Sequence, residues 1–171
     1  MNKPYSHDVR NVAGKTVTLK PETGVAVELL EVNVIFTDQA STTAALAFAQ
    51  SLARGLGARI HLHFAMEVPY QLPLESPGVS VSFVQEQLSS ALADLEKDGV
   101  EPRAHLYLCR DRVRALQQAL KPKSLVVIGA RKRWWPTAES RIAGALRARG
   151  HWVMCVDSKA PAELERALIS R

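Results

Sequence analysis

Cysteines and long apolar runs are both scarce in this sequence. The chain holds two cysteines, Cys109 and Cys155, with no Cys-x-x-Cys or metal-ligand spacing, so we expect two buried free thiols. No window approaches the roughly 18 consecutive apolar residues of a membrane-spanning helix. The N-terminus, MNKPYSHDVR, also lacks the apolar run of a signal peptide. These absences predict a soluble, cytoplasmic protein with no membrane partner.

Enzyme motifs are missing as well. The sequence has no phosphate-binding P-loop, no Gly-x-Gly-x-x-Gly after its first predicted strand, no Gly-x-Ser-x-Gly and no His-Glu-x-x-His. Carboxylates that lie close together, such as Glu163 and Glu165, fall in a tail helix and are expected to be solvated. Since no nucleophile or general base stands out, we predict that the protein is not an enzyme.

The net charge of +5 is concentrated in one stretch of the chain. Between Gly129 and His151 there are six cations and one anion, so the rest of the sequence is near balance. A basic patch of this kind can attract phosphate, nucleic acid or an anionic surface. Clustered surface arginines are more often a hydrated face, so nucleic acid is not the expected partner.

Strand-like and helix-like segments alternate along most of the chain. At 171 residues the chain is long enough for one α/β domain with a tail at each end. The alternation predicts an open twisted sheet of five parallel strands, in the order 3-2-1-4-5, with helices on both faces. The expected strands are 32–37, 59–65, 101–109, 125–128 and 152–156; the expected helices include one capped by Ser41, residues 79–98, and one capped by Asp111.

Other segments flank or interrupt this pattern. Residues 1–31 are predicted to be an N-terminal extension with a mobile start (1–15) and a short hairpin over 16–30, where apolar residues alternate on both sides of a turn. Residues 32–157 make up the α/β domain, and 158–171 a C-terminal helical tail. The proline-rich connection 67–78 cannot be regular structure, and we assign it no role.

The stretch 124–157 reads as a buried strand, a turn opened by Gly129, a cationic loop, a Ser-headed helix and a closing apolar strand. In this order of elements it resembles the C-terminal half of a universal stress protein domain. The resemblance covers about 32–157 and implies a fold similar to that of adenine-nucleotide hydrolases. It further implies that Asp38, after the first strand, and Phe64, preceded by His63 on the second strand, face a nucleotide. The alternative for Asp38 is that its carboxylate only accepts backbone hydrogen bonds in its turn.

Nucleotide-binding members of that family carry Gly-x2-Gly-x9-Gly-Ser/Thr at the phosphates, and this chain departs from the motif. Gly129 matches the first glycine, but Lys132 stands in place of the second. Counting back from the last strand puts Glu139 at the third glycine and Ser140 at the hydroxyl, and the loop is about three residues short. A carboxylate at a helix N-terminus competes with phosphate for the helix dipole. The resemblance therefore implies the fold without ordinary ATP binding, and we expect no cofactor.

The loop after Gly129 reads Arg131-Lys132-Arg133-Trp134-Trp135. One interpretation is that the tryptophans fill the empty nucleotide site or contact another protein. A second is that Arg131, Lys132, Arg133 and Ser140 bind ATP, another adenine nucleotide or another anion in an altered way. A third, the least favoured, is nucleic-acid binding by charge and base stacking.

Two histidines, His61 and His63, lie on one face of the second predicted strand. A metal ion could use both, but nothing nearby in the sequence offers a third ligand, so we predict no metal site.

The last predicted strand should form an edge of the sheet, and exposed edges recruit partners. The resemblance implies a homodimer through this strand, with His151 near the interface, and with an interface formed by Trp152, Val153, Met154, Cys155 and Val156. The predicted function is a stress-response binding or signalling module that acts through dimerisation and contact with an unidentified protein partner.

Overall fold

The computed structural model describes residues 8–11, 30–97, 100, 102–131 and 137–158. The predicted hairpin over 16–30 falls almost wholly outside these residues, and the C-terminal tail helix does so as well. The loop residues Lys132, Arg133, Trp134 and Trp135 also lie outside them.

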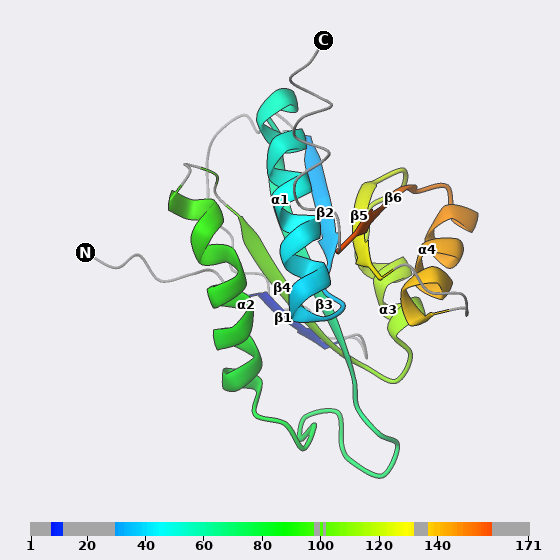
Figure 1. The fold of residues 1–171 in the computed structure, drawn as a ribbon. Helices are drawn as coiled ribbons and strands as arrows, with labels where there is room; N and C mark the ends of the chain where they lie inside the picture. The colour runs from blue at the N-terminus through cyan, green and yellow to red at the C-terminus, as the bar shows by residue number, and fades with distance from the viewer. Residues whose placement is uncertain (1–7, 12–29, 98–99, 101, 132–136, 159–171) are drawn as a thin grey trace, which may run out of the picture.

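A six-stranded parallel sheet, in the order β1-β4-β3-β2-β5-β6, forms the centre of the molecule (Figure 1). The five strands other than β1 reproduce the predicted order 3-2-1-4-5, and their ends fall within two residues of the predicted bounds. The strands are β1 (Asp8–Asn11), β2 (Glu31–Ile35), β3 (Arg59–Glu67), β4 (Arg103–Cys109), β5 (Leu125–Ala130) and β6 (Trp152–Asp157).

The prediction of a mobile start over residues 1–15 is wrong for β1. This strand pairs in parallel with β4, with Asp8 opposite His105 and Asn11 opposite Leu108. Strand pairing at a sheet edge is made by backbone groups, and four residues are too few to show an alternating apolar pattern. The sequence therefore carried no signal for this strand.

Four helices cover the two faces of the sheet. The helices α1 (Gln39–Leu56) and α2 (Val81–Lys97) lie on one face, and α3 (Arg112–Ala119) and α4 (Ala138–Ala148) on the other. Asp111 caps α3 as predicted, by accepting a hydrogen bond from Arg114 N–H at 3.0 Å. No described helix combines the length and the apolar character that crossing a membrane requires.

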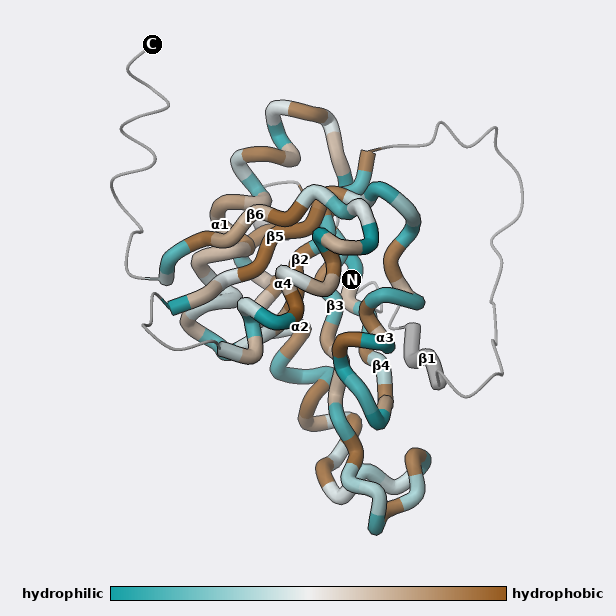
Figure 2. Tube along the Cα trace, turned by 90° about the vertical axis from the view of Figure 1, so that its right-hand side faces the viewer, coloured by the Kyte–Doolittle hydropathy of each residue, from teal (hydrophilic) through white to brown (hydrophobic). Residues whose placement is uncertain are grey.

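The sheet packs against both helix layers because its strands are apolar on both sides. The most hydrophobic stretches in Figure 2 lie along β5 and β6, and β3 and β2 occupy the centre of the sheet. Alternate residues of each central strand point to opposite layers, as the pleat requires. The fully buried members on the α1 and α2 side include Val32, Val34, Ile60, Leu62, Ala45 and Ala49; those on the α3 and α4 side include Ile35, Val126, Ile128 and Leu116.

Candidate functional site

The carboxyl ends of β2 and β5 lie side by side at the point where the strand order reverses. The helix after β2 crosses to one face of the sheet and the helix after β5 to the other. α/β proteins of this type bind ligands in the crevice outside such a switch point. Here the two strand ends are joined, because the Thr37 hydroxyl donates a hydrogen bond to the Gly129 carbonyl at 3.2 Å.

Asp38 begins α1 and replaces the predicted N-cap. Its carboxylate accepts a hydrogen bond from Ser41 N–H at 3.1 Å, so the expectation that Ser41 caps this helix is wrong. Aspartate and serine are both good N-cap residues. Asp38 takes this position because the end of β2 places it where the chain turns. Asp38 therefore does accept a backbone hydrogen bond in its turn, while its contact with a nucleotide stays a prediction.

Arg131 forms an ion pair with the same carboxylate. The guanidinium Nη2 lies 3.6 Å from Asp38 Oδ1, and both side chains are about half exposed. Burial alone would raise the pKa of Asp38, but hydrogen bonds from Ser41 and the charge of Arg131 hold it below its usual value. At neutral pH the cation therefore faces a carboxylate rather than an open anion site.

The presence of glycine at position 129 is explained by packing, which the comparison with the phosphate motif did not reveal. Gly129 is the fifth residue of β5 rather than the first of a turn, which corrects the prediction. A Cβ atom at this position would lie 1.8 Å from the carbonyl oxygen of Ser41 in the first turn of α1. Glycine is therefore required for α1 to approach β5, whether or not a phosphate binds. The hydroxyl of Ser41 is itself buried and has no hydrogen-bond partner within the described part of the chain.

Thr137, which the sequence analysis did not single out, caps α4. Its hydroxyl accepts a hydrogen bond from Ser140 N–H at 3.2 Å, and the Ser140 hydroxyl accepts one from Thr137 N–H at 3.0 Å. This reciprocal capping box commits the Ser140 hydroxyl to the helix start. Glu139 lies in the first helical turn, where its charge complements the helix dipole. The spacing Thr-x-x-Ser was the signal that could have located this start.

Phe64 lies inside β3, and its ring packs on Phe36 with centroids 4.8 Å apart. The neighbouring His63 carbonyl accepts a hydrogen bond from Phe36 N–H at 2.9 Å. The rings of Phe36 and Phe64 lie on the sheet side covered by α1 and α2, and Phe36 directly precedes Thr37 in the chain. Of the predicted site residues, Asp38, Gly129 and Arg131 meet at the switch point, and Ser140 belongs to the α4 cap.

β6 forms one edge of the sheet and presents two large apolar side chains to solvent. Trp152 is 71% exposed and Met154 is 39% exposed, while Val153 is half-buried and Val156 is buried. His151, expected near a dimer interface, is buried at the start of the strand. Within the described ranges β6 pairs with β5 alone.

Part of this edge is covered by α4. Since Trp152 N–H donates to Ser124 on the β5 side, the backbone groups of Val153 point to the open edge. There Arg147 donates to the Val153 carbonyl at 3.0 Å and to Cys155 Sγ at 3.4 Å. Cys155 is exposed, so the prediction that it is buried is wrong. Its strand has no described neighbour on the outer side, in agreement with the prediction that β6 forms an edge of the sheet.

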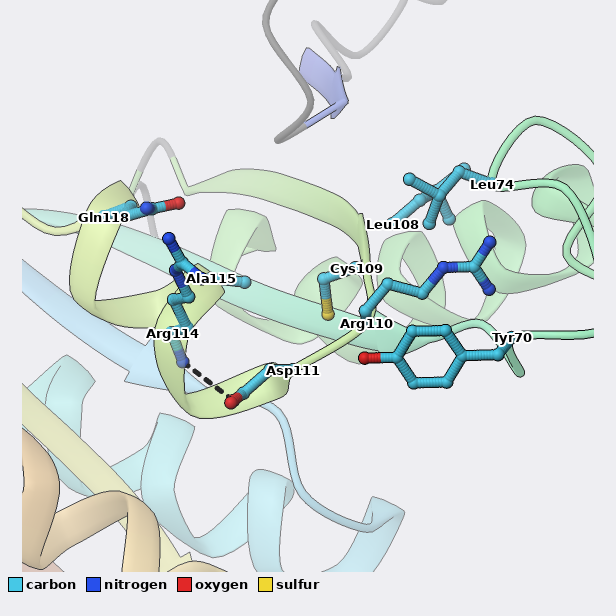
Figure 3. Close-up of a pocket in the computed structure, with 9 residues that line it drawn as sticks. All are labelled: Tyr70, Leu74, Leu108, Cys109, Arg110, Asp111, Arg114, Ala115 and Gln118. Carbon is cyan, nitrogen blue, oxygen red and sulfur yellow. Dashed lines mark hydrogen bonds between the residues drawn. The ribbon is translucent and has the colours of Figure 1, made fainter.

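A concavity with a volume of about 340 Å³ lies at the carboxyl end of β4, beside the start of α3 (Figure 3). Arg110 lines it, but its guanidinium donates to the carbonyls of Val68 and Leu72 and lies over the Tyr70 ring at 5.2 Å from the centroid. Burial raises the pKa of Cys109 in the same wall to about 11, so this buried thiol is not activated. Arg110 thus anchors the start of the proline-rich connection to β4.

The histidines of β3 do have a third histidine beside them. β4 pairs with β3 so that His105 lies opposite His63, and its ring nitrogen is 2.9 Å from that of His61. The prediction that nothing near His61 and His63 offers a third ligand is therefore wrong. The sequence could not show this because parallel pairing brings together residues 44 positions apart.

No protein-family model matches the chain, and no curated protein sequence matches it. Solved structures do match. The chain is similar to a universal stress protein from Archaeoglobus fulgidus, with a TM-score of 0.55 and 20% identity over 74% of this chain and 93% of that one. It is also similar to a protein of the universal stress protein family from Burkholderia pseudomallei, with a TM-score of 0.54 and 20% identity over 80% and 99% of the two chains.

A third structure is the Archaeoglobus fulgidus universal stress protein in complex with dAMP. It matches with a TM-score of 0.50 and 18% identity over 77% of this chain and 99% of that one. At such identities the likeness establishes the fold alone. The chain has the fold of the universal stress proteins, as its sequence predicted.

Proposed function

We propose that this chain, built on the universal stress protein fold, is a dimeric binding or signalling module in a stress response. In this proposal it has lost ordinary ATP binding and acts in the cytoplasm through contacts with another protein. It performs no catalysis and needs no cofactor.

The observation that carries the proposal is that Thr37, Gly129, Asp38 and Arg131 already contact one another at the switch point. Thr37 donates to Gly129, Arg131 faces Asp38, and the Ser140 hydroxyl completes the cap of α4. Gly129 itself is explained by its approach to α1. A phosphate would have to displace contacts that the chain already makes, and displacing a charge-assisted contact costs binding free energy.

The exposed edge of β6 supports the dimer. Trp152 and Met154 form an apolar surface on a strand whose outer side has no described partner. Large apolar side chains next to unpaired backbone groups favour association through the edge. Arg147 covers one of the outward carbonyls, so we expect the apolar side chains to contribute more to the dimer than a long run of backbone hydrogen bonds.

The second candidate function is nucleotide or anion binding through Arg131, Lys132, Arg133 and Ser140. Two observations favour it: the similar Archaeoglobus fulgidus protein has been solved in complex with dAMP, and the Asp38–Arg131 ion pair is long and half exposed. Exposed ion pairs are worth about 0–1 kcal/mol, so a nucleotide phosphate could compete for Arg131. The unpartnered Ser41 hydroxyl lies at the same switch point.

Thermal unfolding with and without millimolar ATP, ADP or AMP and magnesium separates the two. A ligand at about 100 times its dissociation constant adds roughly 2.7 kcal/mol of stability, or roughly 5–10 °C for a chain of this size. The proposal predicts no shift with any of the three nucleotides. A nucleotide-dependent rise that Arg131→Ala abolishes would replace the proposal with the second candidate function.

A further inference from the structure

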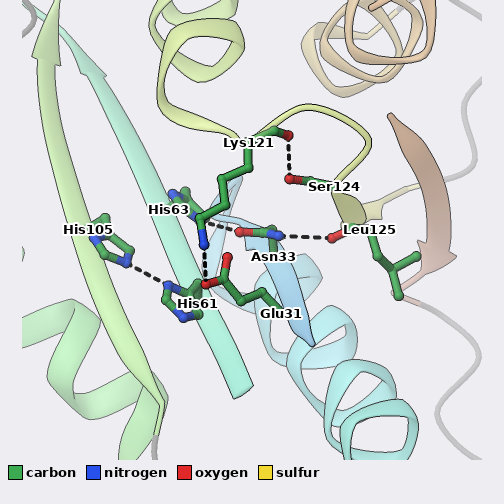
Figure 4. Close-up of polar contacts among 8 residues, drawn as sticks. All are labelled: Glu31, Asn33, His61, His63, His105, Lys121, Ser124 and Leu125. Carbon is green, nitrogen blue, oxygen red and sulfur yellow. Dashed lines mark hydrogen bonds and ion pairs between the residues drawn. The ribbon is translucent and has the colours of Figure 1, made fainter. Parts of the chain in front are cut away.

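A row of aromatic rings crosses β3 and β4 on the sheet face that carries α3 and α4. His61 and His63 come from β3, and His105 and Tyr107 from β4. The rings are nearly parallel: the planes of His61 and His105 differ by 10°, those of His63 and His105 by 17°, and those of His63 and Tyr107 by 6°. Figure 4 shows the three imidazoles close together along β3 and β4, near Glu31 and Asn33. We name His61, His63 and His105 the histidine cluster.

The nitrogen atoms of the histidine cluster lie close to the separation that a metal ion imposes. One ring nitrogen from each residue can be chosen so that all three lie within 4.8 Å of one another. His61 Nδ1 and His105 Nε2 are only 2.9 Å apart. Imidazole nitrogens around tetrahedral zinc lie about 2.0–2.1 Å from the ion, and therefore roughly 3.3 Å from one another.

The strands hold these side chains in place before any ligand binds. His63 lies directly opposite His105 in the register of β3 and β4, and His61 lies two residues earlier on the same face. His61 and His63 are 9% and 4% exposed. Buried side chains on paired strands have few alternative rotamers. The conformational entropy that ligand side chains usually lose when they bind a metal ion has therefore already been lost on folding.

The neighbours of His63 orient its ring. Asn33 donates through its amide nitrogen to the Leu125 carbonyl at 3.2 Å, which leaves the amide oxygen facing His63 Nε2 at 2.8 Å. His63 Nε2 is therefore the protonated nitrogen, and Nδ1, 2.9 Å from the Tyr107 hydroxyl, carries the lone pair. Ligating histidines commonly have their second nitrogen fixed by an oxygen acceptor in this way.

The surroundings of His61 favour the neutral form of its imidazole, which is the form that binds a metal ion. Burial lowers the pKa of His61 below its ordinary value; Glu31 opposes this shift, and Arg103 and Lys121 add to it. His61 Nε2 is buried without a hydrogen-bond partner among the described residues. Glu31, paired with Lys121 at 2.8 Å, adds a carboxylate beside the cluster (Figure 4). A divalent cation here would therefore meet the neutral imidazole of His61, with the charge of Glu31 opposed by the nearby cations Lys121 and Arg103.

We propose that His61, His63 and His105 together bind one divalent transition-metal ion of the class that prefers imidazole, with zinc as the reference ion. Each histidine supplies one nitrogen, and water completes the coordination. The ion replaces the hydrogen bond between His61 and His105 and the one that His63 Nδ1 accepts from the Tyr107 hydroxyl, and it joins β3 to β4. The side chains of the cluster lie on the sheet face that carries α3 and α4, whereas Asp38 begins α1 on the other face, so the proposal does not depend on nucleotide binding or its loss.

The test uses the full chain without an affinity tag, stripped with a chelator, incubated with Zn²⁺ alone and then dialysed. We expect about one zinc ion per chain and a higher unfolding temperature after loading, since a ligand that binds only the folded state stabilises it. His61→Gln and His105→Gln should each weaken zinc binding at least tenfold. The matched control is His151→Gln, because His151 is also buried but lies outside the cluster at the start of β6. It should retain the zinc ion.

If a glutamine variant does not fold, visible absorption of the cobalt-substituted wild type tests whether the histidine cluster binds a metal ion. We expect ligand-field bands of Co²⁺ in a low-symmetry nitrogen site, removed by one equivalent of Zn²⁺. Absence of retained zinc and of these bands would overturn the proposal and leave the cluster as a hydrogen-bonded row of rings. Zinc retention that is equal in wild type, His61→Gln and His105→Gln would overturn it too, because the ion would then bind elsewhere.

Discussion

The carbonyl oxygen of Ser41 lies so close to Gly129 that a Cβ atom at position 129 would be only 1.8 Å from it. This contact fixes how closely the first turn of α1 approaches β5. It also accounts for the one glycine of the phosphate motif that the chain retains, without a phosphate. The switch point is thus a packed junction between two strands and a helix.

Gly129→Ala should destabilise the protein strongly. The added methyl group overlaps backbone atoms, which cannot rotate away, so we expect a loss of about 3 kcal/mol or more in the free energy of unfolding, at or above the top of the usual range for overpacking. The measurement is urea-induced unfolding. The matched control is Gly144→Ala in α4, where the added methyl group meets no atom within 4 Å. It should stabilise the helix by about 0.5–1 kcal/mol, and an equal loss in both variants would contradict the packing account.

Asp38→Ala should cost about 1 kcal/mol in the free energy of unfolding, because α1 loses its N-cap. Asp38→Asn keeps a good cap and removes only the charge that faces Arg131, so it should cost about half as much or less. Asp111→Ala, which removes the corresponding cap of α3, provides the comparison. If Asp38→Asn were as damaging as Asp38→Ala, the ion pair rather than the cap would be the important contact.

Stability should decrease as the pH falls below about 6.5, in part because of two buried histidines. Burial lowers the pKa of His61 and of His151 below the ordinary value of 6.5. The unfolded chain binds these protons more readily than the folded one, so their contribution is intact above pH 6.5 and is lost as the pH falls toward the lowered folded-state pKa values. Urea unfolding in EDTA, at about pH 7.5 and about pH 5.5, measures the change. His61→Gln should show a smaller loss than the wild type, and an unchanged loss would contradict the assignment to His61.

The apolar side chains of β6 should hold the dimer together. We expect light scattering to give twice the mass of the chain for the wild type and a monomer for Trp152→Lys at the same concentration. Trp152 is 71% exposed, so its replacement should leave the monomer fold unchanged. Tyr70→Lys removes another exposed aromatic ring, far from β6 in the proline-rich connection, and should remain dimeric. Monomeric wild-type protein would contradict the proposed interface.

The parts of the fold that could be predicted from the sequence are those in which each segment carries its own signal. The helix over 79–98 and the strand over 125–128 show their period in their own side chains, and the alternation of such segments predicts the parallel sheet and its order. β1 carries no such pattern, because its place depends on backbone groups of β4. The exposure of Cys155 likewise depends on what lies beyond the edge of the sheet.

The candidate site was predictable in part for the same reason. Asp38 and Gly129 follow recognisable strands, so their meeting at the switch point could be inferred from the strand order. Thr137 was missed because counting back from the last strand placed the start of α4 too late. His105 was missed because its position beside His61 depends on the register of two strands, which no local pattern specifies.

Calorimetric titration of the wild type with magnesium and ATP tests the central claim, that the switch point no longer accepts the nucleotide. The account predicts no saturable heat beyond dilution. It also predicts that the double variant Lys132→Gly with Glu139→Gly gains measurable binding, because the two substitutions remove the carboxylate at the helix start and restore the two missing glycines of the phosphate motif. Saturable binding of one ATP per wild-type chain, lost in Arg131→Ala, would contradict the account and assign the arginine-rich loop to the nucleotide.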